Sequence, residues 1–190
     1  MSVAANPLLA LSRAFDQTGA VVAAITPDQY DLPTPCAAWN VRRLLLHIMG
    51  GMAQFENQAK GGPLRDAWDI DLDEDLAAQY ADRAAAILDA WQQPGALERT
   101  VALRFGELPG HAAVEIQVLE QVSHGWDLAK ATGNLDLLAD DLAVHSLSVA
   151  EVAIPEALRG EEGAPFGPRI EPEHDAPPFA RLACFLGRHP

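Results

Sequence analysis

The sequence predicts an all-α protein: a four-helix bundle followed by an extra C-terminal helix and a short irregular tail. Two observations support this prediction. Apolar residues recur every three or four positions over most of the 190 residues, which is the spacing of one helix face. Only residues 100–108 have the composition of a strand, so no alternation of strands and helices indicates a parallel sheet.

The first two helices have clear start and stop signals. Asn6 can cap the first helix, with Pro7 at its first helical position. Three prolines within 26–35 mark a connector, and Asn40 can cap the second helix. The sequence Gly-Gly-Pro at 61–63 is expected to end that helix.

An acidic segment precedes the third helix, because six acidic residues lie within 66–75. A calcium-binding EF-hand loop that began at Asp69 would need Gly at its sixth position and Glu at its twelfth, where this chain has Glu74 and Tyr80. We therefore expect solvated acids in a loop and at the start of a helix over 72–93, where the helix dipole favours negative charge.

The rest of the chain is expected to hold two more helices and a tail. A fourth helix over 111–132 stops at a Gly-Asn pair typical of a C-cap, and a fifth spans 139–158. Five prolines and three glycines make 159–178 irregular, and a short apolar turn closes the chain. The predicted organisation is a helical bundle over 1–158 and a Pro/Gly-rich tail over 159–190 that packs back on it.

Composition and charge exclude several classes of function. The net charge is −14, with 13 basic residues against 27 acidic ones, and Arg42-Arg43 is the only adjacent basic pair. Nucleic-acid binding requires clustered basic residues, so we expect neither a nucleic acid nor an anionic membrane as a partner. No apolar stretch approaches the ~18 residues of a membrane span, and the N-terminus lacks the basic region of a signal peptide. We therefore expect a cytoplasmic protein in which Cys36 and Cys184 are reduced thiols.

Three polar residues lie on helix faces that should meet the core. His47 lies on the apolar stripe of the second helix, between Leu44 and Ile48. Glu120 and His124 are four residues apart on the fourth helix, on or beside its apolar stripe. Burying such groups is costly unless they pair or bind a ligand. Two imidazoles and one carboxylate suit Zn²⁺, with Ni²⁺ and Fe²⁺ as alternatives, and leave coordination positions open for water or substrate.

Each of these residues also has a plainer interpretation. Glu120 and His124 can form a hydrogen-bonded pair with no metal, and His47 can be a satisfied core histidine. Asp127, three residues after His124, can orient an imidazole from its far side, or it can be a capping or solvated acid.

Other residues are expected to be structural. Cys36 lies near a helix start, which can lower the pKa of a thiol, but packing is the preferred interpretation. Trp39 and Trp126 are expected to pack in the core, although either can form a pocket wall. The remaining histidines have no identifiable partner and are expected to be surface or structural residues: His111, His145, His174 and His189.

Two longer stretches resemble a known family. The segments TPCAAWNVRRLLLHIMGG (34–51) and LEQVSHGWDLAKATG (119–133) are similar to the N-terminal domain of mycothiol-dependent maleylpyruvate isomerases. They resemble most the single-domain actinobacterial members of the wider DinB-like superfamily. The ending FARLACFLGRHP (179–190) is similar to the tails of those short relatives, so the resemblance extends over essentially the whole chain.

The resemblance implies an up-down-down-up four-helix bundle with a divalent metal held by His47, Glu120 and His124. It also implies a thiol S-transferase or isomerase in which mycothiol binds the open metal position and attacks an electrophilic small molecule. The isomerase has a separate C-terminal domain where this chain has a short tail, so activity on maleylpyruvate itself is not implied. Two alternatives stay open: a non-catalytic metal- or small-molecule-binding bundle, and a structural bundle that can form a homodimer.

Overall fold

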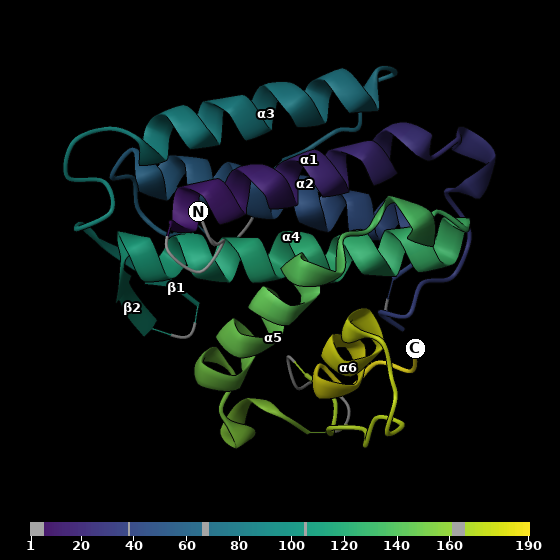
Figure 1. Ribbon diagram of the computed structural model, residues 1–190. Coiled ribbons are helices and arrows are strands. Elements are labelled where there is room, and N and C mark those ends of the chain that lie inside the picture. The colour runs from purple at the N-terminus through teal and green to yellow at the C-terminus, as the bar shows by residue number, and fades with distance from the viewer. Residues whose placement is uncertain (1–5, 38, 66–68, 105, 161–165) are drawn as a thin grey trace.

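Helices form most of the structure, which confirms the all-α prediction (Figure 1). The computed structural model describes residues 6–37, 39–65, 69–104, 106–160 and 166–190. The helices are α1 (Pro7–Ala24), α2 (Val41–Ala59), α3 (Leu76–Trp91), α4 (Gly110–Thr132), α5 (Asp140–Ala153) and α6 (Pro178–Phe185). The strands are β1 (Thr100–Leu103) and β2 (Gly106–Pro109). Short 3₁₀ helices lie at Pro27–Gln29, Leu135–Leu137 and Glu156–Leu158.

Helices α1 to α4 form a bundle in which α1 and α4 run in one direction and α2 and α3 in the other (Figure 1). The end of α1 lies at the end of α4, where Nε2 of Gln29 donates to the carbonyl oxygen of Thr132 (3.4 Å). The end of α2 lies near the start of α4, since Gln58 donates to the carbonyl oxygen of Ala102 in β1. This is the up-down-down-up topology that the resemblance implies.

Helix α4 lies at the centre of the molecule, in contact with α1, α2, α5 and α6. Sixteen of its 23 residues are buried. Its approach to α1 is close, because a Cβ on Gly125 would lie 2.6 Å from Oγ1 of Thr18. That hydroxyl donates to the carbonyl oxygen of Gln121 (2.9 Å). Polar side chains on α4 therefore have to find their partners inside the protein.

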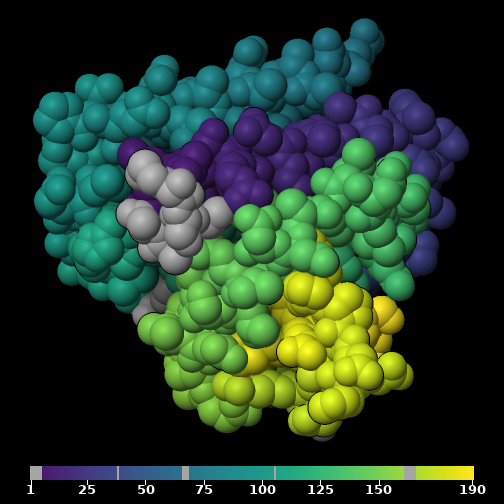
Figure 2. Space-filling model, viewed as in Figure 1, coloured from purple at the N-terminus to yellow at the C-terminus, as the bar shows by residue number. Residues whose placement is uncertain are grey.

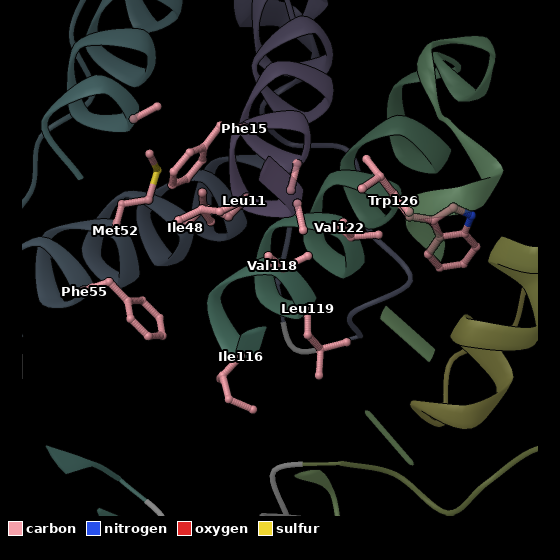
Figure 3. Packing of buried hydrophobic residues seen from close by; sticks show 14 of the residues in the cluster. Leu11, Phe15, Ile48, Met52, Phe55, Ile116, Val118, Leu119, Val122 and Trp126 are labelled. Carbon is pink, nitrogen blue, oxygen red and sulfur yellow. The ribbon is translucent and has the colours of Figure 1, made fainter. Parts of the chain in front are cut away.

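The hydrophobic core fills the space between these helices (Figure 3). Phe15 of α1 meets Tyr80 of α3 edge to face, with ring centroids 6.3 Å apart and an interplanar angle of 79°. Buried apolar residues of α1, α2 and α4 in this core include Leu11, Ile48, Met52, Val118 and Val122. This packing fixes α2 and α4 relative to each other, which a site shared between them requires.

Two helix ends differ from the prediction. Helix α3 begins later than predicted, at Leu76, because Oδ1 of Asp75 caps it by accepting from the backbone N–H of Ala78 (3.0 Å). Helix α5 ends earlier than predicted, at Ala153. The cause is Pro155, which has no N–H to continue the helix and disfavours helical backbone at the residue before it.

Two segments are more regular than predicted. The single strand-like segment is a hairpin, in which Thr100 pairs with Pro109 and Leu103 with Gly106. The predicted closing turn is a helix, α6, with Pro178 at its first position. Helices α5 and α6 lie side by side and cover one part of the bundle (Figure 2). Within the described ranges, none of the helices is long and apolar enough to cross a membrane.

Candidate metal centre

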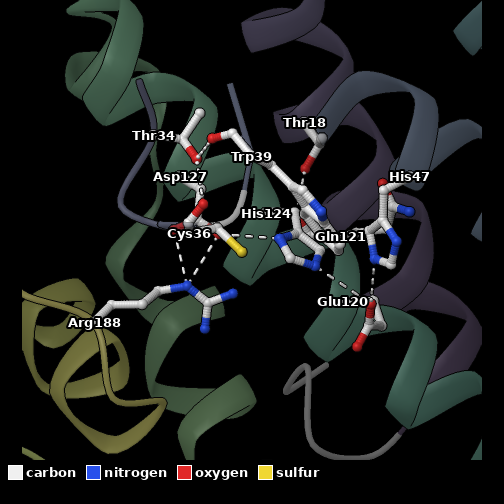
Figure 4. A network of polar contacts seen from close by, with 10 residues as sticks. All are labelled: Thr18, Thr34, Cys36, Trp39, His47, Glu120, Gln121, His124, Asp127 and Arg188. Atoms are coloured by element: carbon white, nitrogen blue, oxygen red, sulfur yellow. Dashed lines mark hydrogen bonds and ion pairs between the residues drawn. The ribbon is translucent and has the colours of Figure 1, made fainter. Parts of the chain in front are cut away.

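Two helices bring His47, Glu120 and His124 to one place. Asn40 caps α2 by accepting a hydrogen bond from the backbone N–H of Arg43 (2.9 Å), and His47 follows about two turns after the cap. Glu120 and His124 are one turn apart on α4, with both side chains on the face toward α2 (Figure 4). The structure therefore places the three side chains together, and their role as metal ligands stays a prediction.

The distances between the three donor groups are compatible with ligands of one ion. Oε2 of Glu120 lies 3.6 Å from Nε2 of His47 and 3.5 Å from Nε2 of His124. Charged N–H···O bonds are shorter, about 2.7–2.9 Å. Around a tetrahedral zinc ion with ligands at about 2.0–2.1 Å, neighbouring ligand atoms lie about 3.4 Å apart. One ligand atom from each residue lies within 4.8 Å of the others, so the donor set fits a divalent metal ion.

One side of this cluster is open and the other is closed. The side chains of His47 and Glu120 are 37% and 38% exposed, whereas that of His124 is 9% exposed. A pocket of about 470 Å³ reaches His47, and Trp39 forms part of its wall. The ring of Trp39 packs on that of His47, with centroids 4.3 Å apart and an interplanar angle of 36°. An ion held here would keep coordination positions on the pocket side for water or a ligand.

The closed side of His124 faces a buried acid. Nδ1 of His124 lies 3.0 Å from Oδ2 of Asp127, and the Asp127 side chain is 0% exposed. An ionised carboxylate only accepts hydrogen bonds, so this contact puts the imidazole proton on Nδ1 and leaves the lone pair of Nε2 free on the side of Glu120. Asp127 thus lies in contact with the imidazole that it was predicted to orient.

The electrostatics of the cluster favour an ionised Glu120. Removal from water alone would raise the pKa of Glu120, but the nearby imidazoles, that of His124 first, lower it well below its ordinary value. Burial also opposes the charged form of His124, yet the contacts with Asp127 and Glu120 raise the pKa of His124. A cation that binds here therefore has to displace a proton from His124 rather than from Glu120.

The remaining residues singled out in the sequence are not among the three candidate ligands. Burial raises the pKa of the Cys36 thiol, and the charge of Arg188 offsets this only in part, which disfavours the thiolate form. Trp126 is buried in the core (Figure 3). Nε2 of His145 lies 2.7 Å from Oε2 of Glu115, a contact that joins α5 to α4 and that the sequence did not reveal. The other three predicted surface histidines are exposed: His111, His174 and His189.

Sequence reasoning missed Arg188, which contacts Asp127 from near the end of the chain. Its Nε lies 2.9 Å from Oδ1 and 3.1 Å from Oδ2 of Asp127. The two residues are 61 positions apart, so no helix or strand periodicity relates them. The available signal was the ending of the chain, which resembles the tails of short relatives but does not indicate a contact.

Fold and site together define a four-helix-bundle protein with a candidate divalent-metal centre built between two facing helices. The sequence profile of the mycothiol maleylpyruvate isomerase N-terminal domain matches residues 11–129, and the chain belongs to this family. Two uncharacterized proteins of Mycobacterium tuberculosis, MT0763 of strain CDC 1551 / Oshkosh and Rv0738 of strain ATCC 25618 / H37Rv, are each 34% identical over 183 residues, covering 96% of this chain and 98% of the relative. No solved structure gives a significant match.

Proposed function

We propose that the protein is a metal-dependent thiol S-transferase or isomerase that uses mycothiol and acts on an electrophilic small molecule. The observation that carries the proposal is the close spacing of His47, Glu120 and His124, of which His47 also lines a pocket. Zn²⁺ suits this donor set best, and Ni²⁺ and Fe²⁺ accept the same donor types. Membership of a mycothiol-related family supports mycothiol as the thiol.

The residues of the site have distinct tasks in this proposal. A bound divalent cation lowers the pKa of a thiol that reaches it, so that the nucleophilic thiolate is present at neutral pH. His47 and His124 provide neutral donor atoms, and Glu120 provides the negative charge. Asp127 holds the ring of His124, and Trp39 shields one wall of the pocket from water.

The pocket wall favours an electrophile with an anionic group. Three arginines line the pocket, although acidic residues outnumber basic ones 27 to 13 in the whole chain: Arg43, Arg65 and Arg104. Guanidinium groups bind carboxylates and phosphates in a bidentate manner. We therefore propose an electrophile that carries a carboxylate or phosphate group.

Two glycines in the floor of the pocket leave space for a bulky ligand beside His47. Gly50 and Gly51 lie within α2, where each glycine costs about 1 kcal/mol relative to alanine. A Cβ at either position would meet no atom within 4 Å, so packing does not require a glycine there. Their missing side chains leave room for a ligand the size of a sugar thiol.

A second candidate is a non-catalytic metal- or small-molecule-binding protein. One observation favours it: of the described residues that line the pocket, Asp69 is the one carboxylate and His47 the one histidine. If His47 holds a metal, it cannot also act as a general base. Among the described carboxylates and histidines that line the pocket, Asp69 is then the one left for that role. Turnover therefore has to be tested separately from binding.

Metal analysis of the purified protein tests the proposed centre. Wild type and the matched control His145→Ala should retain about one Zn²⁺ per chain, whereas His47→Ala should lose it, because His145 pairs with Glu115 away from the cluster. Mycothiol should then bind only the metal-loaded protein. Consumption of an anionic electrophile would support the enzyme, and binding without consumption would support the second candidate.

A further inference from the structure

The end of the chain reaches the candidate metal centre from its buried side. Figure 4 shows Arg188, Asp127 and His124 in a continuous line that ends at Glu120. Nε of Arg188 lies 2.9 Å and 3.1 Å from the two Asp127 oxygens, and Oδ2 of Asp127 lies 3.0 Å from Nδ1 of His124. The exposed fractions along this line are 11% for Arg188, 0% for Asp127 and 9% for His124.

Arg188 holds the Asp127 carboxylate in the position from which it contacts His124. Nε of Arg188 lies against both oxygens of Asp127 and so fixes where they lie. Oδ2 of Asp127 can then accept the Nδ1–H of His124, which fixes the orientation of the ring. With its proton on Nδ1, His124 turns the lone pair of Nε2 toward Glu120, where a metal can use it.

The backbone around Arg188 fixes its position. The N–H of Arg188 donates to the carbonyl of Ala183 (2.9 Å) and that of Gly187 to the carbonyl of Cys184 (3.0 Å), the hydrogen-bond pattern of a Schellman motif at the end of α6. Gly187 has a φ angle of +78°, in the left-handed region that favours glycine. A Cβ there would lie 2.8 Å from the backbone of Gly167. The chain turns sharply at this glycine and directs Arg188 toward α4.

We propose that Arg188 is a positioning residue of the metal centre, which acts through Asp127 to hold the ligating tautomer and orientation of His124. The C-terminal segment, residues 166–190, thereby sets the metal affinity of a site whose ligands all lie on α2 and α4. The inference rests on the metal site of the proposed function and adds to it a residue that contacts neither metal nor substrate.

The test measures the Zn²⁺ dissociation constant by competition with a chelator. Arg188→Met should weaken binding about 10–100-fold, the usual effect of losing an outer-shell partner. The matched control Arg181→Met removes a guanidinium from α6 that donates to the backbone carbonyls of His174 and Ala176, and it should bind like wild type. In an Asp127→Asn background, Arg188→Met should cause no further loss, because the two residues act as one unit.

The conservative variant and the imidazole proton separate positioning from general stability. Arg188→Lys keeps the buried charge but offers a single amine, so its affinity should lie between those of wild type and Arg188→Met. The Nδ1–H resonance of His124 should persist in Arg188→Lys and be lost in Arg188→Met. Wild-type affinity in Arg188→Met or in Asp127→Asn, or an equal loss in both backgrounds, would overturn this inference alone. Failure of wild type to bind Zn²⁺ would overturn the proposed function and this inference with it.

Discussion

Glu120 provides the one negative charge of the proposed ligand set. Its Oε2 lies between two imidazole nitrogens at nearly equal distances, 3.5 and 3.6 Å, and its pKa lies below the ordinary value. A carboxylate in this position can stabilise a cation between the rings, or the protonated ring of His124 when no metal is bound. The charge, rather than the shape, of Glu120 is therefore what the site depends on.

Replacing Glu120 by glutamine should test that dependence. Glu120→Gln keeps the size of the side chain but removes the charge, so Zn²⁺ affinity should fall by more than the ~10–100-fold expected for an outer-shell residue. Glu115→Gln is the matched control, since Glu115 lies on the same helix and contacts His145 instead. Equal Zn²⁺ dissociation constants for the two variants, measured with a chelator, would contradict the ligand role of Glu120.

Zn²⁺ affinity should rise with pH because of His124. The pKa of His124 is raised, so below that pKa the metal has to displace a proton, and above it the displacement no longer opposes binding. The pKa of Glu120 is lowered, so Glu120 is already ionised above its ordinary value of about 4.3 and adds no pH dependence there. Calorimetry at about pH 6 in two buffers of different ionisation enthalpy should detect proton release that shrinks as pH rises. Release that grows with pH would contradict this assignment.

At the scale of elements, α2 combines the proposed ligand and the pocket floor on one face. His47, Gly50, Gly51 and Gln54 follow the i, i+3, i+4, i+7 spacing and all line the pocket. Helix α2 is thus both a wall of the core and the surface on which a ligand would lie. The glycines weaken the helix without a packing reason, which is typical of a position kept open for function.

Two substitutions of Gly51 should separate stability from binding. Gly51→Ala should raise the free energy of unfolding by up to about 1 kcal/mol, because alanine is the better helix former and its Cβ meets no neighbour. Gly51→Leu should leave Zn²⁺ affinity unchanged but weaken mycothiol or electrophile binding, since it fills the pocket beside His47. Thermal unfolding and ligand titration measure the two effects. A loss of stability in Gly51→Ala would show that packing does require the glycine.

Elements with strong local signals were predictable, and those fixed by tertiary contacts were not. The start of α2 after Asn40 follows from a capping side chain, and the end of α4 from Gly133 in the left-handed conformation. The predicted fifth helix ran past Pro155, whose missing N–H and steric effect on Ile154 end the helix at Ala153. Helix α6 was missed because a helix of eight residues depends on packing against α5 rather than on its own propensity.

At the scale of the whole molecule, the candidate site is assembled from three distant parts of the chain. Polar residues on apolar helix faces indicated His47, Glu120 and His124, and spacing within α4 indicated Asp127, because these signals are local to a helix. The contact of Arg188 with Asp127 depends on how α6 packs against α4 and α5, which no local pattern encodes. The same holds for the pocket arginines, which come from α2, a loop and the hairpin.

The complete protein should bind mycothiol with release of a proton. If the thiol reaches a metal at His47, Glu120 and His124, it binds as thiolate, so its proton leaves to solvent. Affinity should then rise with pH until the free thiol ionises or hydroxide competes for the same position. Calorimetry with Zn²⁺-loaded protein in two buffers of different ionisation enthalpy counts the protons, and metal-free protein is the control. Binding without proton release, or equal binding to metal-free protein, would place mycothiol away from the metal and remove the basis for thiolate chemistry at this site.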